Sequence, residues 1–155
     1  MRDENNIKVE QVESVKQFVP KTHFSVCNIS EPSTGLEVKF SMRHTAAMAL
    51  SYIDTGSLTA YDDVIANRDD LVKLRNKVEI IDKKFDSRMQ SEVIINLTDG
   101  RSLTKFWDAG VPMVDASVQE NKLTEKFKAL VVPVYGAPAA EKTVGSCLKS
   151  VSYTH

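Results

Sequence analysis

Residues 91–107 read SEVIINLTDGRSLTKFW, and this stretch decides the fold class. Apolar side chains recur at every second position from Val93 to Leu97, and a second alternating run extends from Leu103 to Trp107. Asp99-Gly100 separates the two runs, and both residue types tolerate the positive φ that a tight turn requires. The segment therefore predicts an antiparallel β-hairpin.

The sequence around this hairpin predicts further strands and a set of helices. Further strands are expected at 78–82 and at 15–19, where Pro20 stops the chain, and a long loop is expected over 21–35. The predicted helices are a buried Ala- and Met-rich helix over 41–53 closed by Gly56, helices at 59–65 and 69–77, one from Ser117 to Gly136, and a last one beginning at Pro138. Strands and helices are segregated along the chain. This order predicts the α+β class, with a small antiparallel sheet around the central Asp-Gly hairpin and helices packed on one face.

The length and the net charge of the chain limit the classes of function that it can have. The 155 residues predict a single domain over 7–150, with flexible termini at 1–6 and 151–155. Lys and Arg total 20 against 21 Asp and Glu, for a net charge of −1, which argues against a nucleic-acid binder. The apolar runs are too short to cross a bilayer, and residues 1–6 have no apolar signal core. We therefore expect a cytoplasmic protein that does not bind membranes.

Few residues offer recognisable chemistry. Cys27 and Cys147 have no ligand-spaced partners, so no metal is expected. Lys39, Arg43 and His44 place three basic side chains around the start of the helix predicted over 41–53, where the dipole favours anions. His44 could move a proton near neutral pH. The alternative is that His44 is structural and that Lys39 and Arg43 are merely solvated.

Five segments, taken in order, resemble the MmgE/PrpD family. The run from Pro32 to His44 is similar to its P-x-T-x-x-x-A-K-F-S-x-x-Y segment, which likewise leads into an Ala-rich helix. The other four segments are Val9–Val15, Asp69–Val78, Leu97–Arg101 and Leu123–Phe127. The resemblance thus extends over about residues 7–136, nearly the whole chain.

The resemblance implies a fold and a chemistry. The family includes 2-methylcitrate dehydratase, cis-aconitate decarboxylase and iminodisuccinate epimerase, which transfer protons next to a carboxylate without a metal or organic cofactor. Its members are homodimers of chains with a large helical domain and a smaller α+β domain, and the active site lies between the two domains. This chain resembles the smaller domain.

The resemblance also implies roles for individual residues. Lys39 and Ser41 match the family motif, and His44 stands where the family usually carries Tyr, whose pKa is about 10 against about 6.5 for His. We expect His44 to act as proton donor or polariser, and Lys39, Ser41 and Arg43 to orient the carboxylates of a di- or tricarboxylic acid.

The expected protein is therefore the C-terminal domain of a lyase or isomerase that needs a helical domain, in cis or in trans, and is inactive alone. It would use no cofactor and form a homo-oligomer. An apolar docking surface is expected on the helix over 41–53 and on the last helix, at Val144, Cys147 and Leu148. The alternative is a non-catalytic remnant that serves as a dimerisation or carboxylate-binding module.

Overall fold

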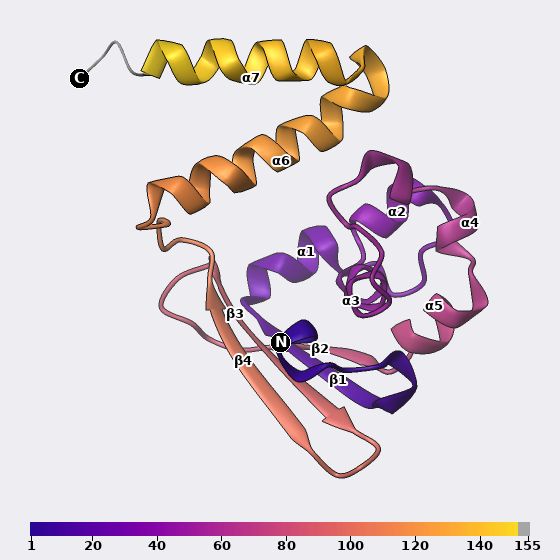
Figure 1. Ribbon diagram of the computed structural model, residues 1–155. Helices are drawn as coiled ribbons and strands as arrows, with labels where there is room; N and C mark the ends of the chain where they lie inside the picture. The colour runs from indigo at the N-terminus through magenta and orange to yellow at the C-terminus, as the bar shows by residue number, and fades with distance from the viewer. Residues whose placement is uncertain (152–155) are drawn as a thin grey trace. The chain divides into compact units, whose positions relative to one another are not determined.

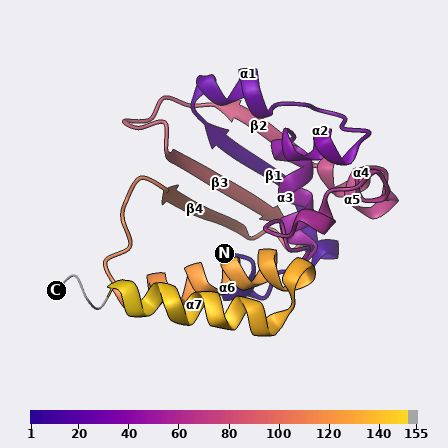
Figure 2. The same cartoon turned by 90° about the horizontal axis from the view of Figure 1, so that it is seen from above.

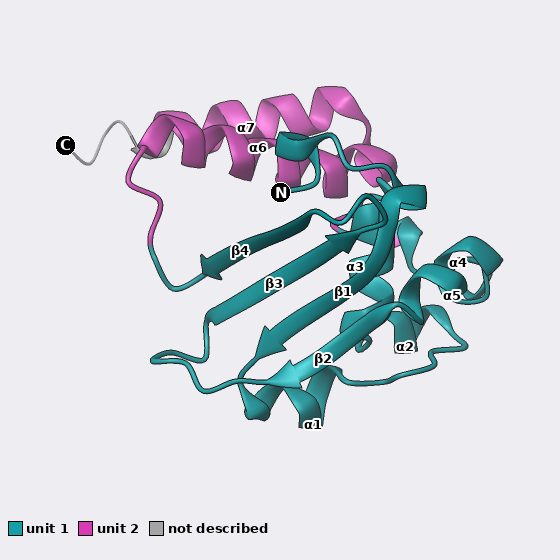
Figure 3. Cartoon of the chain, turned by 90° about the horizontal axis from the view of Figure 1, so that it is seen from below, with its two compact units in different colours: residues 1–55, 59–111 teal, residues 56–58, 112–155 magenta. Residues whose placement is uncertain are grey.

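The computed structural model describes residues 1–151 (Figure 1). The chain forms two compact units (Figure 3). Unit 1 comprises residues 1–55 and 59–111, and unit 2 comprises 56–58 and the residues from 112 on. Of the two termini expected to be flexible, residues 152–155 lie outside the described residues. The single domain expected over 7–150 stays a prediction.

A four-stranded sheet with the order β2-β1-β3-β4 forms the centre of unit 1 (Figure 2). The strands are β1 (Val12–Val19), β2 (Val78–Asp82), β3 (Gln90–Leu97) and β4 (Ser102–Asp108). Strand β1 pairs antiparallel with β3 but parallel with β2. The α+β class is confirmed, but the sheet is mixed rather than wholly antiparallel. A parallel pair needs a long crossover, and here the segment between β1 and β2, which carries helices, provides it.

The hairpin of β3 and β4 forms as predicted. Gly100 has a φ of 87°, and its N–H donates to the carbonyl of Leu97 at 2.9 Å. The Asp99 carboxylate accepts a hydrogen bond from the N–H of Arg101 at 3.0 Å. Local turn chemistry therefore sets the register of this pair.

Short helices connect the strands of unit 1. They are η1 (Asp3–Asn5), η2 (Val9–Gln11), η3 (Lys21–His23), α1 (Phe24–Cys27), α2 (Gly35–Lys39), α3 (Met42–Leu50), η4 (Leu58–Ala60, partly in unit 2), α4 (Asp63–Ala66) and α5 (Asp69–Arg75). The long loop expected over 21–35 thus contains two short helices. Residues 1–6 include η1, and the next residue, Ile7, is buried in the core.

Helix α3 ends earlier than predicted, at Leu50 rather than at Ile53. Tyr52 takes the left-handed conformation, with a φ of 60°, and the N–H of Ile53 donates back to the carbonyl of Met48 at 3.0 Å. This is the Schellman arrangement, in which Gly is usual at the left-handed position. Tyrosine is not the residue type expected at a left-handed position, so the sequence pattern does not predict that α3 ends here.

The core of unit 1 lies between the sheet and α3 with α5. Its fully buried side chains include Met48 of α3, Leu71 of α5, and Val12, Val15 and Leu97 of the sheet. Apolar burial of this kind is the main stabilising contribution in a domain of this size.

Unit 2 is a helical hairpin of α6 (Ala116–Tyr135) and α7 (Ala137–Val151). Asp115 caps α6 by accepting from the N–H groups of Ser117 and Val118, so the helix starts slightly before the predicted Ser117. Gly136, with a φ of 80°, separates the helices as expected. None of the α6 side chains is buried, and among the described side chains of α7 only Ala140 is.

Candidate functional site

A corner formed by α2 and α3 carries the residues singled out from the sequence. Thr34 and Glu37 form a capping box: the Thr34 hydroxyl accepts from the Glu37 N–H at 3.3 Å, and the Glu37 carboxylate accepts from the Thr34 N–H at 3.1 Å. Hydrogen bonds from the Ser33 backbone and side chain lower the pKa of Glu37. The start of α2 is thereby fixed.

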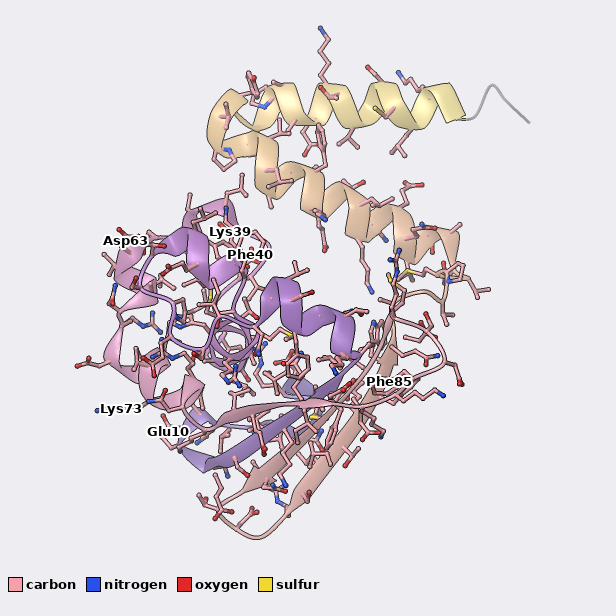
Figure 4. All side chains as sticks on the ribbon, turned by 180° about the vertical axis from the view of Figure 1, so that it is seen from behind. Glu10, Lys39, Phe40, Asp63, Lys73 and Phe85 are labelled. Atoms are coloured by element: carbon pink, nitrogen blue, oxygen red, sulfur yellow. The ribbon has the colours of Figure 1, made fainter. Side chains whose placement is uncertain are left out.

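Gly35 lets α2 approach the segment before α4 closely. A Cβ at this position would lie 2.3 Å from the carbonyl oxygen of Tyr61. The Gly35 N–H donates to the Asp63 carboxylate at 2.9 Å. This contact explains why α2 begins with glycine. Lys39, the last residue of α2, lies in the same region as Asp63 (Figure 4).

Ser41 is the N-cap of α3. Its hydroxyl oxygen accepts from the His44 N–H at 3.2 Å, and the residue is 1% exposed. The hydroxyl is thus engaged with the backbone of α3 and buried, a structural position.

His44 lies in the interior and is 0% exposed. Its Nε2 is 3.1 Å from the carbonyl oxygen of Ile65 and therefore carries the hydrogen, whereas Nδ1 has no hydrogen-bond partner. Burial lowers the pKa of His44; the hydrogen bond to Ile65 opposes this, and the charges of Arg75 and Arg68 act in the same direction as burial. The imidazole is therefore neutral at pH 7 and closed off from solvent.

The three basic residues point to three different neighbours. The Lys39 ammonium lies 5.4 Å from the centre of the Tyr61 ring, and Arg43 donates to the Asn28 side-chain oxygen at 2.6 Å. Lys39 is exposed and Arg43 is partly buried. Lys39, Arg43 and His44 thus lie on one corner of the fold, but their side chains contact different partners and do not point to one common site.

Two residues near this corner were missed by sequence reasoning. Tyr61 donates from its hydroxyl to the carbonyl of Thr55 at 2.7 Å, and burial raises the pKa of its phenol. Arg75 is 7% exposed; it donates to the carbonyl of Pro32 at 3.4 Å, and its Nε has no partner. The spacing from Leu71 to Arg75 is the signal available, since a residue four positions after a buried leucine shares its helix face.

The sequence model of the MmgE/PrpD C-terminal domain matches residues 1–150. The chain belongs to the MmgE/PrpD family. None of the curated proteins compared with the chain matches it.

Three of the five segments that resemble MmgE/PrpD proteins lie where one element of this fold passes into the next. Pro32–His44 covers the α2–α3 corner, Asp69–Val78 covers α5 and the start of β2, and Leu97–Arg101 is the hairpin turn. Of the other two segments, Val9–Val15 covers η2 and the start of β1, and Leu123–Phe127 lies within α6. His44, the last residue of the Pro32–His44 segment, is inside the domain.

Other kinds of site are not apparent in the described part of this MmgE/PrpD domain. Within residues 1–151, no group of three or more His, Cys, Asp or Glu side chains is arranged to hold a metal ion. None of the helices described there has the length and hydropathy needed to span a bilayer.

Each of the two units described in this MmgE/PrpD domain carries a groove. The α3 groove, of about 870 Å³, lies in unit 1 between the Met42–Ala49 face of α3 and the strands β3 and β4. The hairpin groove, of about 660 Å³, lies in unit 2 between α6 and α7 and is lined by Leu123, Phe127, Val144 and Leu148. His44 lines neither groove.

Proposed function

We propose that this chain is the C-terminal part of an MmgE/PrpD lyase or isomerase that acts on small di- or tricarboxylic acids. The family match over residues 1–150 carries the proposal. Removing a proton next to a carboxylate needs a base, a proton donor and stabilisation of the enolate-like charge. The α2–α3 corner supplies cations for such a substrate and no accessible acid–base pair. The remaining groups come from a helical partner domain.

Lys39 and Arg43 are the carboxylate-binding groups in this proposal. Lys39 is exposed and its charge faces an aromatic ring rather than an acid, so a substrate carboxylate meets little competition. Arg43 is held by a neutral amide, Asn28, which keeps its charge available. Ser41 positions Arg43 by fixing the start of α3.

His44 takes part in proton transfer in this proposal only if Nδ1 becomes accessible when the helical partner binds. Nδ1 is the ring nitrogen with a lone pair and without a partner. In the described arrangement the residue acts by position, through its hydrogen bond to Ile65. A His44→Gln variant separates the two roles, since loss of a proton-transferring group changes the pH profile of kcat, whereas loss of a positioning group does not.

The partner docks on unit 2. The α6–α7 pair is joined by an ion pair of Lys128 and Glu141 at 2.6 Å, but its helices bury almost nothing. Helices that bury no apolar face are marginal in water. The apolar hairpin groove therefore fits helices of a helical domain. The proposal also includes a homodimeric assembly in the cytoplasm.

The test is reconstitution. The chain is co-expressed with the helical domain of a 2-methylcitrate dehydratase, and the purified pair is assayed with 2-methylcitrate, cis-aconitate and iminodisuccinate. We expect turnover of one acid, reduced at least tenfold by Lys39→Ala and by Arg43→Ala and unchanged by Lys73→Ala, a matched exposed lysine on α5. A stable complex without turnover of any acid would contradict the proposal.

A second function is favoured by one observation, the complete burial of His44. A domain whose family tyrosine position is filled by a closed-off imidazole suits a non-catalytic dimerisation or carboxylate-binding module. Such a module would bind citrate at the α2–α3 corner, and citrate would raise the Tm of the chain alone. The double variant Lys39→Ala, Arg43→Ala would abolish that increase, and an unchanged increase in the variant would exclude the corner.

A further inference from the structure

Residues 1–6, which we call the strap, connect the two walls of the α3 groove. On one wall, the Arg2 guanidinium donates a hydrogen bond to the carbonyl of Ala49, in the last turn of α3. On the other wall, Glu4 forms an ion pair with Lys105 of β4 at 2.6 Å. The strap is therefore attached to α3 by one side chain and to the sheet by another.

The strap also occupies one end of the groove. Met1, Arg2 and Asp3 are among the residues that line it. The Met1 side chain is partly buried and packs against the apolar core of unit 1. Detachment of the strap would therefore enlarge the groove and expose apolar surface that Met1 covers.

The contacts that hold the strap are exposed to solvent. The Glu4 side chain is 64% exposed and the Lys105 side chain is 39% exposed. The Arg2 guanidinium lies over the ring of Tyr52, which is itself largely exposed. Exposed ion pairs are weak and are screened by salt. A segment held by such contacts can open locally while the rest of the domain stays folded.

The strap ends at a residue that can serve as a hinge. Asn6 has a φ of 48° and a ψ of 46°, the left-handed conformation, which asparagine tolerates better than most residues. The next residue, Ile7, is 2% exposed and belongs to the core. The chain is thus fixed from Ile7 onward, whereas the residues before Asn6 depend on their contacts with the groove walls.

We propose that residues 1–6 form a detachable strap over the α3 groove, which opens when the contacts of Arg2 and Glu4 are weakened. The strap turns about Asn6 and uncovers the end of the groove that Met1 occupies. Access of small molecules to the groove therefore depends on ionic strength. This device is independent of the proposed function.

Amide hydrogen exchange of the complete chain, followed by NMR, tests the proposal. The N–H groups of Asn6 and Ile7 donate to the carbonyls of Asp3 and Arg2, at 3.2 and 3.0 Å, so their exchange reports on the strap. Raising NaCl from about 20 mM to about 500 mM shortens the screening length from about 20 Å to about 4 Å and should speed this exchange about threefold.

A variant of the sheet contact gives the same release without salt. Lys105→Gln should speed the exchange of the Asn6 and Ile7 amides already at low salt and should make it less dependent on salt. Lys16→Gln removes an exposed lysine from β1 and is the matched control, so it should behave as the wild type. Trp107, the one tryptophan of the chain, lines the groove and should be quenched more strongly by acrylamide in Lys105→Gln.

Three results would overturn the proposal. Exchange of the Asn6 and Ile7 amides that does not change with salt would show that charge does not hold the strap. An equal increase at the Val15 N–H, which donates to the carbonyl of Lys77 in the sheet region, would mean that unit 1 as a whole is opening. Faster exchange with unchanged quenching of Trp107 would mean that the strap moves without opening the groove.

Discussion

The Nε2 of His44 lies 3.1 Å from the carbonyl oxygen of Ile65, so the imidazole links α3 to the last turn of α4. The hydrogen bond fixes the proton on Nε2 and leaves Nδ1 facing the interior without a partner. A residue that could serve chemistry is thus used to hold two helices together. The protonation state of His44 is therefore set by its burial and by its hydrogen bond to Ile65.

Stability should therefore decrease in mild acid. Burial holds the folded pKa of His44 below the unfolded value of about 6.5, so the unfolded chain binds more protons as the pH falls below that value. The contribution of His44 to stability is complete above about pH 6.5 and is lost as the pH falls toward the folded pKa. Urea denaturation between pH 7.5 and pH 5 measures the loss. His44→Gln should flatten the slope and His23→Gln should not; equal slopes in all three proteins would contradict this assignment.

Gly35 and Gly145 form a matched pair for backbone substitution. Gly35→Ala should destabilise unit 1 by about 2 kcal/mol or more, because the new Cβ would overlap the Tyr61 backbone and force it to shift. Gly145→Ala lies in α7, where a Cβ meets nothing within 4 Å, and should stabilise its helix by about 1 kcal/mol. Chemical denaturation of both variants gives the comparison. A tolerated Gly35→Ala would mean that α2 is less closely packed than described.

The left-handed backbone of Tyr52 lowers the stability of the fold, and the contact of its ring with Arg2 opposes this effect. Its left-handed backbone costs about 1 kcal/mol relative to Gly, and its ring lies 3.4 Å beneath the Arg2 guanidinium. Tyr52→Gly should therefore change stability little in the wild type and raise it by about 1 kcal/mol in an Arg2→Ala background. A double-mutant cycle measured by denaturation gives the coupling. Zero coupling would show that the ring contact contributes nothing.

The hairpin groove should bind an apolar dye in the isolated chain. Leu123 is exposed and, with Phe127, lines the groove. Leu123→Asp should lower the fluorescence of bound anilinonaphthalene sulfonate, because a carboxylate repels the sulfonate and removes apolar area. Lys126→Gln, an exposed change on the same helix that alters the net charge by the same amount, serves as the control for charge alone. Unchanged dye binding in Leu123→Asp would place the dye elsewhere.

Local signals predicted most of the secondary structure, and contacts distant in sequence account for the differences. The Asp99-Gly100 turn and the Gly136 break were predicted because their chemistry lies within a few residues. The parallel pairing of β1 with β2 depends on how the segment between them folds back. The end of α3 at Tyr52 depends on a residue that rarely adopts a left-handed backbone.

The candidate site was predicted less completely for the same reason. The sequence singled out Lys39, Ser41, Arg43 and His44 by spacing, and the structure places all four at the α2–α3 corner. Their orientation depends on Asn28, Ile65 and Tyr61, which are distant in sequence. Spacing along one helix could not show that His44 faces inward.

The mixed sheet sets an order of folding. The β3–β4 hairpin joins neighbouring residues and can form within microseconds. The parallel pairing of Val15 with Val78 closes a long loop, whose entropic cost must be met before any contact compensates it. The α2–α3 corner lies inside that loop. The part of the chain that carries the candidate site is therefore expected to be the last to acquire its native structure and the first exposed to aggregation or proteolysis when the protein is stressed.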